Sequence, residues 1–200
     1  MSDRSFVRFG GLAGVLLAIT SWAAVTSFYT VAARGQDPIG LQTFQLLYAL
    51  IAFWALFGIV AVYWVTRPFG EAWSFFATLV GVGASLATIT SSLYGAAVIR
   101  EVIARPELRT PAATASDPLN VMSFALTGLW FLIANVLLAR ARYPRLLTAL
   151  GFIAVADLFV GFFAALSGAV NIVTYAGVIA GAIGGPLYWL WLGMLLRRRA

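Results

Sequence analysis

Six long apolar segments occupy most of this chain, and they restrict its fold more than any motif does. A helix that spans a bilayer needs about 20 predominantly apolar residues. Segments of this kind lie at about 9–33, 41–65, 72–99, 120–139, 146–168 and 172–196. Because 62% of the residues are hydrophobic and only 10% are charged, a soluble domain of this size could not bury its apolar surface. We expect an all-α polytopic membrane protein, one domain over residues 1–200, that forms a bundle of six transmembrane helices.

The connections between these segments are short except for the stretch at about 101–119. That stretch is polar and rich in Pro, Ala and Thr, so we expect an irregular loop outside the bilayer. Asp37-Pro38 and Asp117-Pro118 directly precede the second and fourth segments. Asp accepts hydrogen bonds from the free N–H groups of a first helical turn, and Pro fits the first helical position. Each Asp-Pro pair therefore predicts the start of a helix.

The arginines predict how the chain is oriented. All thirteen basic residues are Arg, and with a cytoplasmic N-terminus nine of them lie on the cytoplasmic side: Arg4, Arg8, Arg67, Arg140, Arg142, Arg145, Arg197, Arg198 and Arg199. Four lie on the other side: Arg34, Arg100, Arg105 and Arg109. The positive-inside rule then favours cytoplasmic N- and C-termini and an external loop at 101–119. An aromatic belt is expected at the cytoplasmic interface, formed by Tyr63, Trp64, Trp73, Tyr188, Trp189 and Trp191.

Histidine, cysteine and lysine are all absent from the sequence, and this excludes most known intramembrane chemistry. A serine protease would lack its general base, and a metalloenzyme would lack its usual nitrogen and sulfur ligands. We expect no catalytic residue, no metal site and no cofactor, and a protein that is not an enzyme. The arginines lie at helix ends rather than on a soluble face, so the net charge of +6 does not indicate a nucleic-acid partner.

Small and hydroxyl-bearing residues recur along one face of the third segment. They alternate at spacings of four and three, and they are Ser74, Thr78, Gly81, Ser85, Thr88 and Ser92. Small residues let helix backbones approach closely in lipid. We expect a packing face buried against other helices; the alternative is the polar wall of a permeation path or ligand cavity.

The last segment combines a small-residue pattern with a proline. Gly177, Gly181 and Gly185 lie four residues apart, and a parallel series is formed by Ala176, Ala180 and Gly184. This pattern predicts a close helix crossing. Pro186 follows directly and predicts a kink, because proline removes a backbone hydrogen bond. A shorter series in the first segment is formed by Gly10, Gly14 and Ala18.

Asp157 lies about halfway along the fifth segment. A charged side chain at the bilayer centre costs about 2.5–3.5 kcal/mol on insertion scales, so such residues normally face protein or water. Ala154, Gly161, Ala164 and Gly168 share its helical face, and every arginine lies near a membrane boundary. We expect Asp157 to face the bundle interior, and to be protonated or hydrogen-bonded to hydroxyl, amide or indole groups.

Other candidate ligand-binding residues fall near the depth of Asp157 when the helices are aligned. They are Trp22, Ser85, Thr88 and Trp130, with Asn135 as a further polar group. The two tryptophans lie mid-helix, where a buried indole N–H needs an acceptor. One hypothesis is a midplane cavity with aromatic walls and a single acid. The other is that Asp157 serves only as a hydrogen-bonding group between helices.

Two sequence features near the C-terminus are typical of a known group of proteins. A helix ending in basic residues is followed by the turn 142–146 (Arg-Tyr-Pro-Arg-Leu) and by Leu150-Gly151, and the chain closes with 185–193 (Gly-Pro-Leu-Tyr-Trp-Leu-Trp-Leu-Gly). The last third of the chain thereby resembles small bacterial multi-pass membrane families of unknown function. The resemblance implies a prokaryotic inner-membrane protein and carries no active site with it.

Two functional hypotheses follow. The first, which we prefer, is a non-enzymatic accessory or assembly subunit of a membrane complex, with the lipid bilayer and other membrane subunits as partners. The second is a small-molecule binding or transport protein, either a substrate-binding component or a proton-linked carrier that uses Asp157. In length, helix number and orientation the chain resembles the substrate-binding components of energy-coupling-factor vitamin importers. Their first helix carries an Ala-xxx-Ala contact, where this chain has Gly10, Gly14 and Ala18.

Overall fold

Helices account for the regular structure in the computed structural model of the chain, which describes residues 3–28, 38–105, 117–169, 172 and 179–199. No strand occurs within these ranges. The helical elements are α1 (Asp3–Ser27), α3 (Pro38–Thr66), η2 (Arg67–Phe69), α4 (Glu71–Ala104), α5 (Pro118–Arg140), α6 (Arg145–Leu166), η5 (Ile179–Gly184) and α8 (Gly185–Arg199). The predicted all-helical class is confirmed.

Five of the described helices are long and apolar enough to cross a membrane. They lie at Arg4–Ser27, Ile39–Phe69, Glu71–Ile99, Pro118–Arg140 and Arg145–Leu166, and each overlaps one of the first five predicted segments. The predicted sixth segment, 172–196, is not one uniform helix where it is described. It contains the π-helical η5 followed by α8, which is 15 residues long. The part of the chain that the structure describes therefore supports a membrane protein with five candidate spans.

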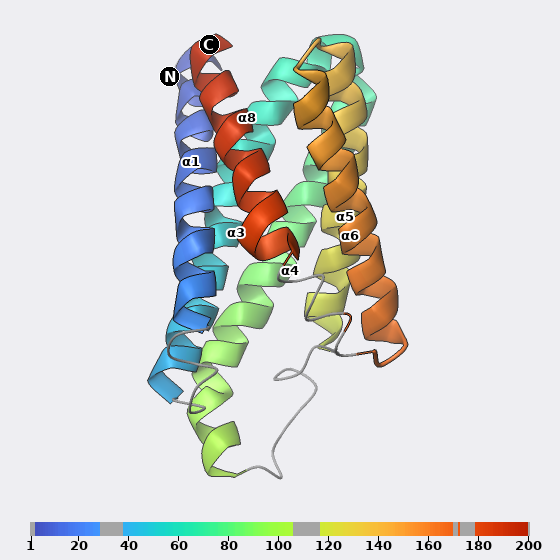
Figure 1. Cartoon of the computed structure of the whole chain (residues 1–200). Coiled ribbons are helices and arrows are strands. Elements are labelled where there is room, and N and C mark those ends of the chain that lie inside the picture. Colours follow the sequence, from blue (N-terminus) through green and yellow to red (C-terminus); the bar gives the residue numbers. More distant parts are fainter. Residues whose placement is uncertain (1–2, 29–37, 106–116, 170–171, 173–178, 200) are drawn as a thin grey trace.

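The helices run up and down along one long axis (Figure 1). Both chain ends lie at one end of the bundle, together with the α3–α4 and α5–α6 turns. Helices that are neighbours in sequence pack side by side from α1 through α3, α4 and α5 to α6. The last helix, α8, returns to pack against α1, and with η5 it also touches α6. The order of the helices in space therefore closes into a ring.

Asp117 starts α5 as the sequence predicts. Its carboxylate accepts hydrogen bonds from the backbone N–H groups of Leu119 at 3.2 Å and Asn120 at 3.3 Å, and Pro118 fills the first helical position. The same carboxylate accepts a hydrogen bond from the Ser91 hydroxyl of α4, so this cap also joins two helices. The corresponding Asp37 lies outside the described residues.

The predicted loop at 101–119 is shorter than expected, because α4 continues to Ala104 and α5 begins at Pro118.

Glycines bring α1 and α8 into backbone contact near the chain ends. A Cβ atom added to Gly193 would lie 2.5 Å from the carbonyl oxygen of Gly11, and one added to Gly11 would lie 2.6 Å from that of Gly193. The crossing predicted at Gly177, Gly181 and Gly185 lies earlier in the last helix, and the structure tests it only at Gly181. A Cβ atom on Gly181 would meet no atom within 4 Å, and Gly177 lies outside the described residues. The crossing occurs later in the helix because α8 lies against α1 near the termini and diverges from it toward η5 (Figure 1).

The small-residue series of α1 and α4 are covered by the bundle itself. Gly10 faces Ala61 of α3, and Ala18 is buried. On α4 the predicted face is turned inward: Ser74, Gly81, Ser85 and Ser92 are buried, and Thr78 and Thr88 are half-buried. The opposite side of α4 exposes large apolar residues, including Trp73, Phe75, Phe76, Leu79, Leu86 and Leu93.

The two threonines of this face are satisfied within their own helix. The Thr78 hydroxyl donates to the Ser74 carbonyl at 2.8 Å, and the Thr88 hydroxyl donates to the Ala84 carbonyl at 3.0 Å. Such bonds to the preceding turn leave a hydroxyl with less need of another partner. These contacts favour the packing interpretation of the face over a polar wall.

We predict that Gly193→Ala destabilises the bundle, because its new methyl group would collide with the backbone of α1. Overpacking of this kind costs about 1–3 kcal/mol. The midpoint of thermal unfolding in detergent should fall accordingly. Gly181→Ala is the matched control, since the space around Gly181 is open, and it should leave the midpoint unchanged or raise it. Equal losses in the two variants would contradict the proposed backbone contact.

Candidate functional site

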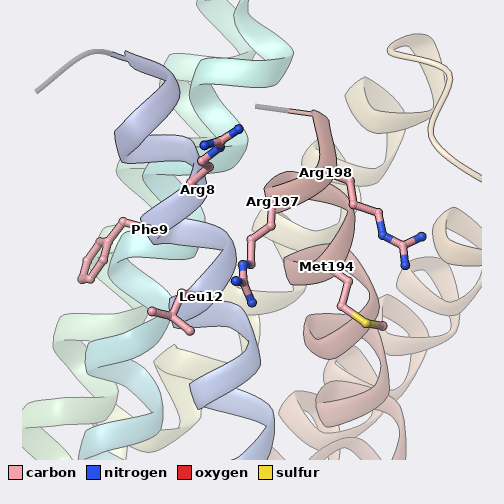
Figure 2. A pocket seen from close by; sticks show the side chains of 6 residues that line it. All are labelled: Arg8, Phe9, Leu12, Met194, Arg197 and Arg198. Carbon is pink, nitrogen blue, oxygen red and sulfur yellow. The ribbon is translucent and has the colours of Figure 1, made fainter.

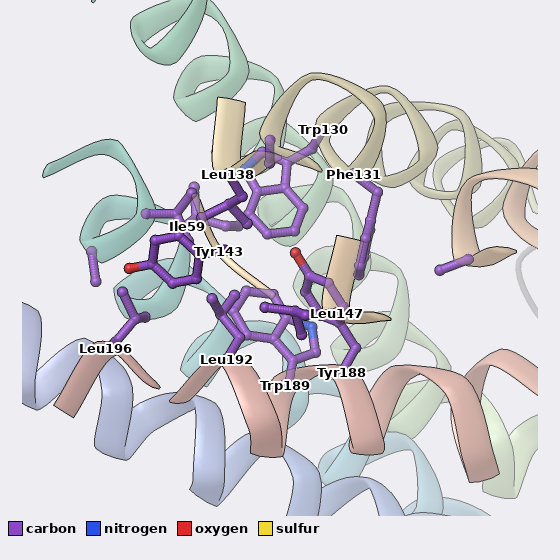
Figure 3. Packing of buried hydrophobic residues seen from close by; sticks show 14 of the residues in the cluster. Ile59, Trp130, Phe131, Leu138, Tyr143, Leu147, Tyr188, Trp189, Leu192 and Leu196 are labelled. Atoms are coloured by element: carbon purple, nitrogen blue, oxygen red, sulfur yellow. The ribbon is translucent and has the colours of Figure 1, made fainter. Parts of the chain in front are cut away.

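Aromatic side chains from α5 and α8 fill the centre of the bundle. The indole of Trp130 is 2% exposed and stacks on that of Trp189, with ring centroids 5.3 Å apart and an interplanar angle of 7°. Phe131 and Tyr188 pack beside this pair with centroids 4.9 Å apart. Figure 3 shows these four rings converging from the two helices. Trp130, which the sequence placed in the wall of a cavity, is here part of a packed core.

Two glycines make room for the stacked indoles. A Cβ atom on Gly81 of α4 would lie 2.6 Å from the Trp130 ring, and one on Gly58 of α3 would lie 2.5 Å from the Trp189 ring. The packing role predicted for Gly81 is therefore explained by an aromatic side chain rather than by a neighbouring backbone. Sequence reasoning did not identify Gly58, because it belongs to no repeated small-residue pattern.

The predicted aromatic belt is wrong at two of its six positions. Tyr188 is fully buried and Trp189 is 6% exposed, and both pack in the core. The spacing of Tyr188, Leu192 and Leu196 marks a helical face turned to protein, and this signal was available in the sequence. Trp73, by contrast, is exposed as a belt residue should be. Trp64 lies under the Arg67 guanidinium, 4.1 Å from the ring centroid.

Asn135 forms a buried polar link between three helices. Its side-chain amide donates to the Phe131 carbonyl at 2.7 Å, and its side-chain oxygen accepts a hydrogen bond from the Tyr188 hydroxyl at 3.2 Å. The amide lies directly against Gly151 of α6, where a Cβ atom would overlap it. Asn135 thus joins α5 to α8 and packs on α6. Its polar groups are used by the fold rather than offered to a ligand.

Trp22 compensates for the proline of the last helix. Its indole N–H donates to the carbonyl oxygen of Ala182 at 3.0 Å. In an α-helix that carbonyl would accept from the N–H of residue 186, but residue 186 is Pro and has no N–H. The predicted distortion takes the form of the π-helical segment Ile179–Gly184 immediately before the proline. A side chain of α1 therefore supplies the donor that Pro186 lacks.

Asp157 is half-buried on α6, and Ala154 on the same face is buried. The Oδ2 atom of Asp157 is enclosed by protein and has no hydrogen-bond partner in the described part of the chain, and the same holds for the hydroxyl oxygens of Ser74 and Tyr143. The expected donors are engaged elsewhere, because Trp22 bonds to Ala182 and Asn135 bonds to a backbone carbonyl of its own helix. The predicted link from Asp157 to an indole or amide group is therefore absent from the described residues.

In the described part of the chain, no hydrogen bond or ring contact joins Asp157 to the other candidate residues. Their hydrogen bonds and ring contacts tie Trp130 and Asn135 to α8, and Trp22 to η5. Thr88 is bonded within α4 and Ser85 is buried in its packing face. None of these contacts reaches Asp157. In the ranges that the structure describes, no cluster of three or more acidic side chains could hold a metal ion.

Two surface cavities lie away from the aromatic core. The first has a volume of about 560 Å³, lies between α1 and α8 near the chain ends, and is lined by Arg8, Phe9, Leu12, Met194, Arg197 and Arg198. The second has a volume of about 480 Å³, follows the outer side of α6, and is lined by Ala156, Phe159, Val160, Phe163, Ala164, Ser167 and Ile172. Ala156, one of the residues that line the second cavity, directly precedes Asp157 in the sequence.

Comparison with known proteins provides no family for this chain. No protein-family model matches it, and no curated protein or solved structure matches it. The resemblance of the last third to bacterial multi-pass families therefore gains no support from these comparisons.

We predict that Trp22→Phe loosens the start of the last helix, because the Ala182 carbonyl loses its donor. Hydrogen bonds between helices in a membrane are worth about 0.6 kcal/mol on average, so global stability should change little. The backbone N–H groups of residues 183–185 and 187 should exchange with deuterium several-fold faster in a mass-spectrometric measurement. Trp191→Phe is the control in the same helix, and it should leave exchange at these four residues unaltered.

Proposed function

We propose that this chain is a non-enzymatic accessory or assembly subunit of a larger membrane complex. We further propose that it crosses a prokaryotic inner membrane six times with both termini in the cytoplasm. The sixth span would contain η5 and α8 (Ile179–Arg199), which return to the end of the bundle where the chain begins (Figure 1). The arginine asymmetry of the sequence supports this orientation.

The packed interior supports a structural role over a transport role. The stacked Trp130 and Trp189, with Phe131 and Tyr188, occupy the space where a midplane path would run. The alternative, a small-molecule binding or transport protein with a midplane cavity around Asp157, depends on open space near that carboxyl group. The second cavity is lined by Ala156, the residue before Asp157, and not by Asp157 itself.

The observation that carries the proposal is the unpartnered Oδ2 atom of Asp157. An enclosed polar atom without a hydrogen bond costs about 1–3 kcal/mol, and acidic residues in spanning helices are normally paired with another group. Asp157 as a residue is only half-buried, so its exposed side is open to a donor from a second polypeptide. We therefore place the contact with a partner subunit on α6.

The outer side of α6 has a shape that suits a partner helix. Ala156, Val160 and Ala164 follow one another at spacing four along the floor of the second cavity, and Phe159 and Phe163 flank them. Small residues between larger ones allow the close approach on which helix association in lipid depends. The small-residue faces of α1 and α4 are already covered by the bundle, so they are not open to a partner.

Substitution of Asp157 tests the assembly. In native membranes at natural expression levels, Asp157→Leu should reduce the complex by about tenfold, since a hydrogen bond to a charged group is worth about 1.5–3 kcal/mol. Asp157→Asn keeps most acceptor capacity and should retain the complex. Native electrophoresis measures the size of the assembly. Thermal unfolding of each purified variant serves as the control for folding.

A cross-link formed from one chosen position identifies the face of α6 that contacts the partner subunit. The sequence has no cysteine, so Val160→Cys introduces a single thiol in the cavity of α6. It should cross-link to another polypeptide, and this product should disappear in combination with Asp157→Leu. Leu79→Cys on the exposed side of α4 is the matched control. A chain that migrates at its monomer mass in native membranes, with no cross-link from residue 160, would rule the proposal out.

The orientation has its own test. Ala72 and Ala104 are exposed at opposite ends of α4, and each can be replaced by Cys with little change in size. In intact cells, a membrane-impermeant thiol reagent should label Ala104→Cys and leave Ala72→Cys unlabelled until the membrane is opened. The reverse pattern would place both termini outside the cytoplasm.

A further inference from the structure

We infer that the cavity between α1 and α8 binds the headgroup of an anionic phospholipid. The cavity has a volume of about 560 Å³, within the range of about 300–1,000 Å³ that is usual for ligand pockets. Three of its six lining residues are arginines and none is acidic. This inference concerns a different face from the contact proposed on α6, and it does not rest on that proposal.

The lining residues divide into a charged part and an apolar part. Arg197 extends between α1 and α8, Arg8 is directed from α1 toward the chain-end side, and Arg198 points away from α1 (Figure 2). Leu12 and Met194, which are 38% and 41% exposed, lie at about the level of the Arg197 guanidinium group. A ligand that fits both parts has an anionic group joined to an apolar chain.

The position of the cavity along the helices agrees with a lipid ligand. Arg8 comes one residue before the exposed Phe9, and Arg197 follows the last apolar turn of α8. The cavity therefore spans the boundary between the arginine-bearing end of the bundle and its apolar sides. In a bilayer this is the depth at which phosphate groups meet acyl chains, and basic pockets between spanning helices bind anionic headgroups at this depth.

Arg199 lies at the same end of the bundle as the cavity, but its side chain contacts the α5–α6 turn instead of lining the cavity. Arg199 donates to the carbonyls of Ala141 at 3.4 Å and Arg142 at 3.1 Å, and its guanidinium lies 4.2 Å from the ring centroid of Tyr143. It therefore secures the α5–α6 turn. Burial raises the pKa of the Tyr143 phenol, although the charge of Arg199 opposes this shift, so the ring under the guanidinium is neutral near pH 7.

Arg197 is held at the cavity by the same glycine contact that joins the two helices. A Cβ atom on Gly11 would lie 2.7 Å from Cγ of Arg197 and 3.1 Å from its backbone nitrogen. The aliphatic part of Arg197 therefore passes directly over Gly11, and its guanidinium is placed on the α1 side of α8. Arg8 of α1 and Arg197 of α8 thus line one hollow from two helices, where a phosphate-bearing headgroup can accept hydrogen bonds from guanidinium groups.

Native mass spectrometry of the purified full chain tests this site. The protein would be titrated in detergent with dioleoyl phosphatidylglycerol and, separately, with dioleoyl phosphatidylcholine. We expect the first bound phosphatidylglycerol to be preferred by about tenfold or more, given two guanidinium contacts near the membrane surface. Added salt should weaken the preference, because it screens exposed charges. Equal binding of the two lipids would overturn the inference.

Two pairs of Arg→Gln substitutions distinguish binding of phosphatidylglycerol at this cavity from general attraction of the anionic lipid to a positive surface. Arg8→Gln combined with Arg197→Gln should abolish the preference for phosphatidylglycerol. Arg140→Gln combined with Arg145→Gln removes the same charge from exposed positions at the same end of the bundle, and it should keep the preference. If both pairs lose it equally, the arginines act only as a diffuse surface charge and the inference fails.

Two further measurements distinguish the source of the anion and control for folding. Inorganic phosphate at millimolar concentration should not displace the lipid, because it cannot occupy the apolar part; full displacement would show a phosphate site rather than a lipid site. The unfolding midpoint of each variant in phosphatidylcholine nanodiscs should match that of the parent. If the Arg8 and Arg197 pair fails to fold, Leu12→Asp, which alters only the apolar part, should reduce phosphatidylglycerol binding in its place.

Discussion

The stacked indoles of Trp130 and Trp189 are the contact on which the rest of the bundle depends. They join α5 to α8, and they occupy space that α3 and α4 provide through Gly58 and Gly81. In lipid, association of helices relies on van der Waals contact because the acyl chains are as apolar as the side chains. Two large flat rings in a glycine-lined slot provide much of that contact, so four helices are held around one pair of side chains.

Polar groups inside this bundle are mostly used by the fold. Trp22 supplies a donor to Ala182 beside Pro186, and Asn135 links its own helix to Tyr188. Because no water satisfies such groups in the hydrocarbon region, each needs a partner within protein. Three enclosed side-chain oxygen atoms depart from this pattern in the described residues, those of Ser74, Tyr143 and Asp157. Of these groups only Asp157 is a carboxyl group within a spanning segment, where a missing partner costs more than it does for a hydroxyl.

The sequence predicted the helices, the capping of α5 by Asp117 and the inward face of α4, because these features follow from local hydrophobicity and residue spacing. It did not predict the partners of Trp22, Trp130 and Asn135. Aligning the helices by depth in the bilayer gives the level of a side chain but not its direction around the helix axis. The crossing at Gly193 was missed for a related reason. A glycine contact needs a facing residue on another helix, here Gly11, and no pattern within one helix reveals it.

The late position of α8 in the chain has a consequence for biogenesis. Tyr188, Trp189, Leu192 and Leu196 come from the last helix but are among the most buried residues of the protein. Until these residues have been synthesised, the Asn135 amide oxygen lacks the hydrogen bond from the Tyr188 hydroxyl, and the face of Trp130 that stacks on Trp189 is uncovered. Before α8 is in place the bundle is therefore an open ring of helices, accessible to chaperones and proteases. Its core is complete only when α8 has packed against α1 and α5.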